Sequence, residues 1–141
     1  MSGESAFPDQ GGAAYLDSSP LAKLVLGERE SGPLRTWLTG WPRRASSTLS
    51  RLEVIRAVRR AAPHEEARAR AVLDTIDLIL VTDDHLQRAE RVGDPQLGSL
   101  DALCLATAIE ISAEVLVAYD RRLLASARAA GLRVESPGAG A

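Results

Sequence analysis

The stretch LDALCLATA at residues 100–108, followed by the apolar run VLVA at residues 115–118, carries the strongest fold signal in the chain. Residues 100–108 are apolar on nearly every side, which predicts a buried helix with Asp101 in its first turn. The run at 115–118 is typical of a strand buried on both faces, and Asp120 lies just beyond its end. Two carboxylates fixed at such places are costly unless something cationic lies between them.

The same alternation of short apolar strands and helices continues on both sides of this stretch. Strands are predicted at residues 13–16, 76–81, 115–118 and 132–134, whereas residues 45–47 form a poor strand by themselves. Helices are predicted after the Ser19-Pro20 start signal, at 32–41, from 48 to the break at Pro63, and at 64–73, 83–92, 99–111 and 120–130. Ser19 is expected to cap the first of these helices, and Ser99 the helix at 99–111. This pattern predicts an α/β domain with a parallel sheet covered on both faces.

Composition places the chain among ordinary soluble domains. It has 141 residues, of which 45% are hydrophobic and 26% charged, enough for one domain with its own core. The net charge of −2 provides no global positive field for nucleic acid. The single Cys104 excludes an internal disulfide and is interpreted as a small core residue of a reduced, cytoplasmic protein.

The ends of the chain differ from its middle. Residues 1–12 are predicted to be a disordered lead-in, residues 13–137 the folded domain, and residues 138–141 a flexible tail. The N-terminus lacks the basic and apolar segments of a signal peptide, and no apolar run approaches the ~20 residues of a membrane span. We therefore expect no membrane association.

Four carboxylates occupy places where ligand sites form in such folds. Asp17 and Asp120 follow predicted strands, and parallel α/β sheets bind ligands beyond the carboxyl ends of their strands, where the strand order reverses. Asp101 lies in the first turn of the helix that leads into the strand at 115–118, and Glu53 lies one turn into an earlier helix. If the strands before Asp17 and Asp120 are neighbours, all four side chains can converge.

A cluster of this kind favours divalent metal ions. Without cations the four acids would repel and raise one another's pKa. Mg²⁺ prefers oxygen ligands and often completes its shell with phosphate oxygens, which is the logic of a phosphodiester nuclease. Two ions about 4 Å apart would activate water and stabilise the leaving oxygen. Zinc is disfavoured because His64 and His85 lack ligand spacing and Cys104 stands alone.

Each acid also has a structural explanation. Asp17 could be a turn or cap residue, and Asp120 is well placed as a helix N-cap. Glu53 could be a solvated residue that pairs with the arginine three or six positions further on. Asp101 could merely complement the helix dipole. None of these explanations requires the four side chains to lie together. The occurrence of all four acids at positions from which they can converge therefore indicates a functional site.

Four motifs in this order closely resemble the PIN domain and, more narrowly, the VapC toxins of type II toxin–antitoxin pairs. They are YLDSSPL at 15–21, SRLEV at 50–54, SLDA at 99–102 with LATA at 105–108, and YDRRL at 119–123 with AGL at 130–132. The resemblance extends from about residue 13 to residue 137. The chain departs from it at Cys104, where many relatives have histidine, and this concerns substrate choice more than catalysis.

The resemblance implies a three-layer α/β/α domain with a central parallel sheet. It implies an Mg²⁺-dependent endoribonuclease, with Mn²⁺ as a substitute, that forms a homodimer and is inhibited by a cognate VapB-like antitoxin. By motif, Asp17, Glu53, Asp101 and Asp120 correspond to the catalytic metal ligands. Ser18 corresponds to a helper that acts through its hydroxyl group and is a candidate for RNA binding.

Contacts with the RNA substrate or the antitoxin have further candidates. Arg121 and Arg122 follow an acid of the cluster and could grip phosphates, and Arg51, Arg56, Arg59 and Arg60 could extend that track. The alternative for all of them is a solvated helix face.

Two tryptophans and the function as a whole also leave alternatives open. Trp37 and Trp41 could line a groove for an antitoxin helix, pack in the core or form the dimer contact. The alternative to an enzyme is a catalytically silent PIN-like binding module. The four acids favour the enzyme, because a binding module needs no such cluster.

Overall fold

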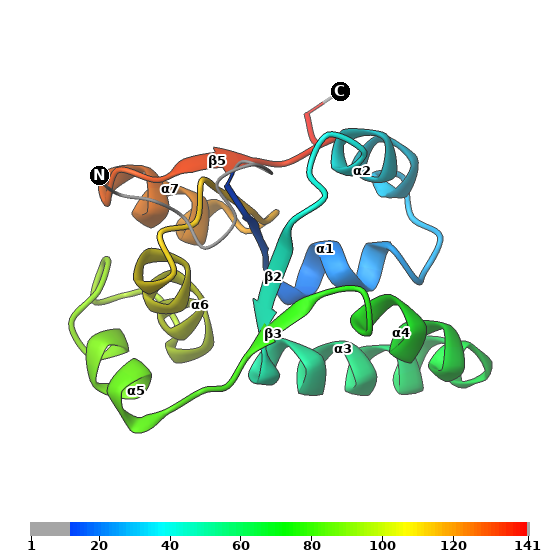
Figure 1. Ribbon diagram of the computed structural model, residues 1–141, viewed down its shortest axis with the longest axis horizontal. Helices are drawn as coiled ribbons and strands as arrows, with labels where there is room; N and C mark the ends of the chain where they lie inside the picture. The colour runs from blue at the N-terminus through cyan, green and yellow to red at the C-terminus, as the bar shows by residue number, and fades with distance from the viewer. Residues whose placement is uncertain (1–11, 141) are drawn as a thin grey trace.

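The computed structural model describes residues 12–140, and the lead-in predicted at 1–12 lies almost wholly outside them. Five parallel strands form one sheet in the order β3-β2-β1-β4-β5 (Figure 1). The strands are β1 (Ala14–Leu16), β2 (Arg44–Ser47), β3 (Asp77–Ile79), β4 (Val115–Val117) and β5 (Arg133–Glu135). The helices are α1 (Ser18–Lys23), α2 (Ser31–Leu38), α3 (Thr48–Ala61), α4 (Glu66–Leu73), α5 (Asp83–Ala89), α6 (Ser99–Glu110) and α7 (Arg121–Ala129), with a 3₁₀ turn at Pro63–Glu65.

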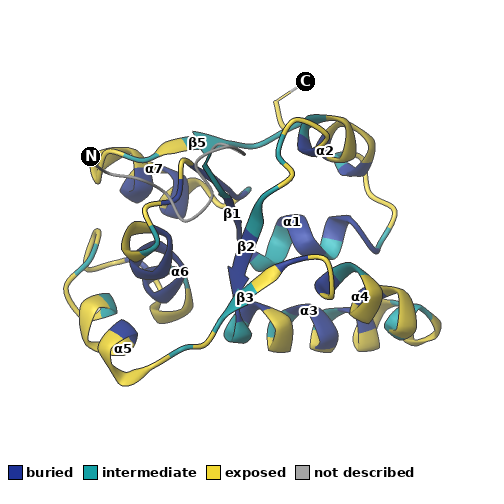
Figure 2. Cartoon of the chain, in the orientation of Figure 1, coloured by how far each residue is buried: buried dark blue, intermediate teal, exposed yellow. Residues whose placement is uncertain are grey.

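Helices cover both faces of the sheet, as a three-layer α/β/α domain requires. One apolar core joins α1 to α4 with Leu16 and Val117 of the central strands. The other joins α6 and α7 with Tyr15 and Leu116, which point the opposite way. Figure 2 shows the resulting buried interior with exposed outer helix faces. The predicted α/β fold with a central parallel sheet is confirmed.

Local signals set most helix starts. Ser47 caps α3, since its side chain accepts a hydrogen bond from the backbone N–H of Ser50. Thr82 caps α5, and the side chains of Thr82 and His85 together form a capping box. The chain leaves α7 through Gly131, whose φ of +90° lies in the left-handed region. No helix in residues 12–140 is both long and apolar enough to cross a membrane.

Two predicted caps are wrong. We expected Ser19 to cap α1, but the N-cap is Asp17 and Pro20 is the third helical residue. Proline is tolerated there because the first N–H groups of a helix have no acceptor within it. We expected Ser99 to cap α6, but Gly98 takes that position and Ser99 is the first helical residue.

The segment judged a poor strand is β2, which lies between β1 and β3. Its polar residue Ser46 is completely buried, and its hydroxyl donates a 2.6 Å hydrogen bond to the carbonyl oxygen of Leu16. That bond satisfies the one polar group that the side chain adds, so serine can occupy a central strand. Pairing with β1 therefore outweighs the low strand propensity of residues 45–47.

Candidate active site

The sheet brings Asp17 and Asp120 to one edge. β1 and β4 are adjacent and parallel, with Leu16 opposite Val117, and each acid follows the carboxyl end of its strand. The strand order reverses at this pair, because β2 and β3 extend to one side of β1, whereas β4 and β5 extend to the other. The expectation that the two strands are neighbours at the reversal is confirmed.

Two helices bring the other acids to the same region. Glu53 lies in the second turn of α3, which starts directly after β2, and Asp101 is the third residue of α6. Both side chains are half-buried rather than fully solvated. Asp17 is buried, with 8% of its surface exposed, and Asp120 is exposed.

The acids act on one another electrostatically. Burial raises the pKa of Asp17 to about 6; the backbone N–H of Ser18 opposes this shift, and the charges of Asp101 and Glu53 add to it. Burial also raises the pKa of Glu53, as does the charge of Asp101. These three acids therefore share one region of negative potential.

Asp120 joins this group through Asp101. The pKa of Asp101 is raised by burial first and by the charge of Asp120 second. Every one of the four predicted acids thus interacts with at least one other, and Asp101 interacts with all three. These pairwise interactions link the four predicted acids electrostatically.

The capping and ion-pair explanations for the four acids hold for some of them and fail for others. Asp17 occupies the N-cap of α1 but makes no side-chain capping bond. Asp120 caps α7, its Oδ1 accepting from the backbone N–H of Leu123 at 2.9 Å. Glu53 is not held by the arginine at position 59, which forms an ion pair with Glu66 instead. Capping accounts for Asp120 in part and leaves the mutual approach of all four unexplained.

Two buried residues behind the acids were not predicted as part of the site. The Cys104 thiol lies one turn after Asp101. Burial, and next the charge of Asp17, raise its pKa well above the usual value, so it is a neutral thiol. Tyr15 is fully buried, and its hydroxyl finds no hydrogen-bond partner within residues 12–140. The spacing of Cys104 three residues after Asp101 was the available signal, since it places both on one helix face.

The three residues predicted to contact RNA lie beside the acids. The Ser18 hydroxyl partly opposes the rise that burial causes in the pKa of Glu53. Arg121 and Arg122 are exposed at the start of α7, immediately after Asp120. Ser18 therefore acts on an acid of the site, whereas the arginines are accessible to a ligand.

The donor set suits a hard divalent cation. Four oxygen ligands that raise one another's pKa are relieved by positive charge, and Mg²⁺ typically takes one or two carboxylates directly while keeping several waters. As they stand, however, the described side chains include no group of three or more His, Cys, Asp or Glu that could hold a metal ion. A zinc site is disfavoured further because the His85 ring is engaged by Glu110 and Thr82.

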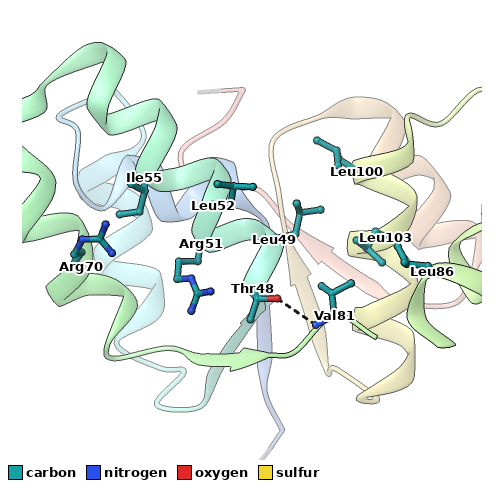
Figure 3. A pocket seen from close by; sticks show the side chains of 10 residues that line it. All are labelled: Thr48, Leu49, Arg51, Leu52, Ile55, Arg70, Val81, Leu86, Leu100 and Leu103. Atoms are coloured by element: carbon teal, nitrogen blue, oxygen red, sulfur yellow. Dashed lines mark hydrogen bonds between the residues drawn. The ribbon is translucent and has the colours of Figure 1, made fainter. Parts of the chain in front are cut away.

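An apolar groove adjoins the acid-bearing helices. It encloses about 620 Å³ between α3 on one side and α5 and α6 on the other (Figure 3). Leu52, Leu86 and Leu100 line it, each about half exposed. Such a concentration of exposed leucine is typical of a protein contact surface.

The tryptophans predicted to line an antitoxin groove lie elsewhere. Trp37 and Trp41 stack on each other with ring centroids 5.3 Å apart, partly buried against the core formed by α1 to α4. The guanidinium of Arg133 lies over the Trp41 ring. Of the alternatives weighed for them, core packing is the one that this position favours.

Comparisons with known proteins agree with this geometry. The PIN domain matches residues 14–129. Ribonuclease VapC47 of Mycobacterium tuberculosis (strain CDC 1551 / Oshkosh) is 42% identical over 132 residues, covering 89% of this chain and 97% of that protein. Ribonuclease VapC46 of M. tuberculosis (strain ATCC 25618 / H37Rv) is 36% identical over 127 residues, covering 89% and 98%.

Solved structures give the same result. A chain in a toxin–antitoxin complex from Klebsiella pneumoniae superposes with a TM-score of 0.69 and 27% identity, covering 88% of this chain and 97% of that one. M. tuberculosis VapC20, described as a sarcin-ricin loop cleaving toxin, also superposes with a TM-score of 0.69, over 84% and 95% of the two chains. At 21% identity, the latter shows likeness of fold.

Proposed function

The chain belongs to the PIN-domain family and, within it, to the VapC ribonucleases, and on this premise we propose that it is a metal-dependent endoribonuclease whose site is Asp17, Glu53, Asp101 and Asp120. The observation that carries the proposal is the electrostatic coupling of these four acids at the strand reversal. A cluster of acids that destabilises itself at neutral pH has a chemical use when a cation completes it.

The residues divide the work according to their surroundings. Asp17 is the buried acid and would hold Mg²⁺ or Mn²⁺ together with Asp101. The half-buried Glu53 and Asp120, which is oriented by its bond to Leu123, complete the donor set. When bound, the ions supply the positive charge that activates water and stabilises the leaving oxygen.

The substrate would approach from the exposed side of the site. Arg121 and Arg122 are exposed next to Asp120 and can donate to phosphate oxygens. The net charge of −2 leaves RNA affinity to these arginines and the metal ions. We therefore expect RNA binding to weaken steeply when the ions are chelated.

The decisive experiment is cleavage of total cellular RNA by the purified protein with Mg²⁺, with Mn²⁺ and with EDTA. Asp101→Asn removes a charge from the centre of the cluster, and Asp74→Asn removes one from an exposed position after α4. We expect discrete fragments with metal, loss of cleavage in EDTA and in Asp101→Asn, and full cleavage by Asp74→Asn. Equal cleavage by the two variants would contradict the proposal.

A silent binding module is the second candidate function. It is favoured by the observation that the described acids include no group already arranged to hold a metal ion. The same assay separates the two functions, because a folded protein that binds Mg²⁺ or RNA without cutting any RNA in the pool would be a binding module.

We further propose that the protein acts as a homodimer inhibited by a VapB-like antitoxin in the cytoplasm. The apolar groove between α3 and α6 supports the dimer, because a two-fold axis can bring Leu52 and Leu100 of two copies together. Leu52→Glu should convert the dimer to a monomer in light scattering, whereas Ile109→Glu, also exposed on α6, should not. A monomeric wild-type protein would exclude the dimer.

A further inference from the structure

Three arginines from separate elements line a pocket away from the four acids. Arg35 of α2, Arg44 at the start of β2 and Arg68 of α4 surround about 360 Å³, together with Leu24, Ala71, Val72 and Thr75. We call this the arginine pocket. We propose that the arginine pocket binds an acidic segment of a protein partner, with a carboxylate between the guanidiniums and an apolar neighbour on the aliphatic wall.

The charges in the arginine pocket are poorly neutralised by the chain itself. Arg44 is half-buried and donates to the carbonyl oxygens of Trp41 and Leu38, both at 2.9 Å, but to no carboxylate in the described chain. Burial alone lowers its pKa, with no opposing carboxylate. A half-buried guanidinium held only by neutral carbonyls leaves room for a further anion.

The other two guanidiniums are also weakly engaged. Arg35 donates to the carbonyl oxygen of Leu24 at a long 3.4 Å. Arg68 lies 3.8 Å from Glu65, near the limit for an ion pair, and both side chains are partly exposed. Three positive charges therefore face one concavity, and none of the residues that line it is acidic.

A peptide fits this surface better than RNA does. Arg44 begins β2. Ser47 ends this strand and caps the helix that carries Glu53. The arginine pocket therefore opens at the opposite end of the strands from the acids. Arg44 and Ser47 lie about 10 Å apart along this strand at ~3.3 Å per residue. The side chains of Leu24, Ala71 and Val72 offer an apolar wall that a phosphate backbone does not use, whereas a peptide with alternating acidic and apolar residues does.

This inference rests on the proposed function in one respect: that function includes a protein antitoxin, and the arginine pocket is where an acidic stretch of it would be held. The test does not depend on nuclease activity. It uses the full chain and a fluorescein-labelled acetylated peptide, Leu-Glu-Leu-Glu-Leu, beside its Leu-Gln-Leu-Gln-Leu counterpart and a labelled uridine pentanucleotide. All three are titrated in EDTA by fluorescence anisotropy and by the shifts of arginine Nε–H resonances.

The variants keep the cap of α2 intact. Arg44 bonds two carbonyls near the end of that helix, so the test variant is Arg35→Gln with Arg68→Gln, both exposed. The control is Arg91→Gln with Arg128→Gln, which removes the same charge from exposed positions just after α5 and on α7. Circular dichroism checks that both proteins are folded.

We expect the acidic peptide to bind wild type and control equally and the test variant at least tenfold more weakly. The glutamine peptide should bind at least tenfold more weakly than the acidic peptide. Equal binding of the two peptides, no resonance shift at several millimolar acidic peptide, or tighter binding of the pentanucleotide that is lost in the test variant would each overturn the proposal. RNA cleavage by the test variant is measured separately, so failure of the nuclease is distinguishable from failure of the arginine pocket.

Discussion

The Oδ1 atom of Asp120 accepts a 2.9 Å hydrogen bond from the backbone N–H of Leu123, while the charge of the same carboxylate raises the pKa of Asp101. One side chain thus starts a helix and contributes to the acid cluster. Asparagine keeps the first role and removes the second, because its amide oxygen caps a helix as well as aspartate does.

Asp120→Asn is therefore expected to abolish RNA cleavage without loss of stability. Asp120→Ala should also abolish cleavage and should lower the free energy of unfolding by about 1 kcal/mol, because the cap is lost. Denaturant unfolding and the RNA assay on both variants check this pair. A large loss of stability in Asp120→Asn would indicate that the charge, rather than the cap, holds α7.

The raised pKa of Asp17 predicts how stability depends on pH in the metal-free protein. Its pKa is 3.8 when unperturbed and about 6 in the fold, so the folded state binds the proton more tightly. The stabilisation is therefore complete below pH 4 and is lost as the pH rises through 6, by about 3 kcal/mol for this group. Urea unfolding of wild type in EDTA at pH 5 and pH 7 should show the decline.

Asp17→Asn tests the origin of that decline. Asparagine carries no charge into the buried position, so the variant should be more stable than wild type at pH 7 in EDTA, and its stability should change less between pH 5 and pH 7. Asp74→Asn, at an exposed position, should behave as wild type. An identical pH profile for Asp17→Asn would assign the effect to other groups.

Binding of a divalent metal ion should offset the loss of folding stability that repulsion among the four acids causes. A ligand that binds only the folded state at 100 times its Kd stabilises it by about 2.7 kcal/mol. We expect millimolar Mg²⁺ to raise the melting temperature of wild type and Asp74→Asn by several degrees and that of Asp101→Asn by much less. Calorimetric melting with Mg²⁺ and with EDTA measures the difference, and equal shifts in all three proteins would place the ion elsewhere.

The hydrogen bond from Ser46 to the carbonyl of Leu16 predicts that replacing this buried serine destabilises the protein. Ser46→Ala should lower the free energy of unfolding by about 1–3 kcal/mol, because a buried acceptor loses its 2.6 Å partner. Ser136 makes a bond of the same length to the carbonyl of Ala118 but is only partly buried, so Ser136→Ala should cost less. Chemical denaturation of the two variants compares them, and a larger loss in Ser136→Ala would contradict the argument from burial.

Gly131 and Gly27 form a matched pair for backbone strain. A Cβ atom at either position would meet no atom within 4 Å, but only Gly131 has a left-handed φ, of +90°. Gly131→Ala should therefore destabilise the protein by about 1 kcal/mol, whereas Gly27→Ala should not. Equal unfolding midpoints for the two variants would show that the chain relaxes around position 131.

Patterns local in sequence predicted the fold well, and those that depend on pairing did not. The apolar runs before Asp17 and Asp120, and their alternation with helical segments such as the nearly all-apolar α6, were sufficient to predict an α/β domain with its sheet buried on both faces. Residues 45–47 of β2 were judged a poor strand because Ser46 is polar. The hydrogen bond of Ser46 to Leu16 arises only after the strands pair. The start of α1 was misplaced because proline is accepted anywhere in the first turn.

The four acids of the proposed site stay a prediction, whereas the adjacency of the two strands that precede Asp17 and Asp120 is confirmed. The sequence motifs pointed to all four acids, and the sheet order explains why Asp17 and Asp120 approach. The effect of Asp17 on the Cys104 thiol could not be predicted from the chain, because the two residues approach only when α6 packs on the sheet. The arginine pocket likewise joins three elements that no motif connects.

The pairing of β1 with β4 joins residues about one hundred positions apart, with Ala14 opposite Val115. During synthesis the ribosome releases the first of the four acids long before the last, and contacts of such sequence separation form slowly. A growing chain that ends before β4 therefore cannot assemble the cluster. Toxicity of this protein is expected to begin only with the finished, folded polypeptide, which gives an antitoxin made at the same time an interval in which to bind.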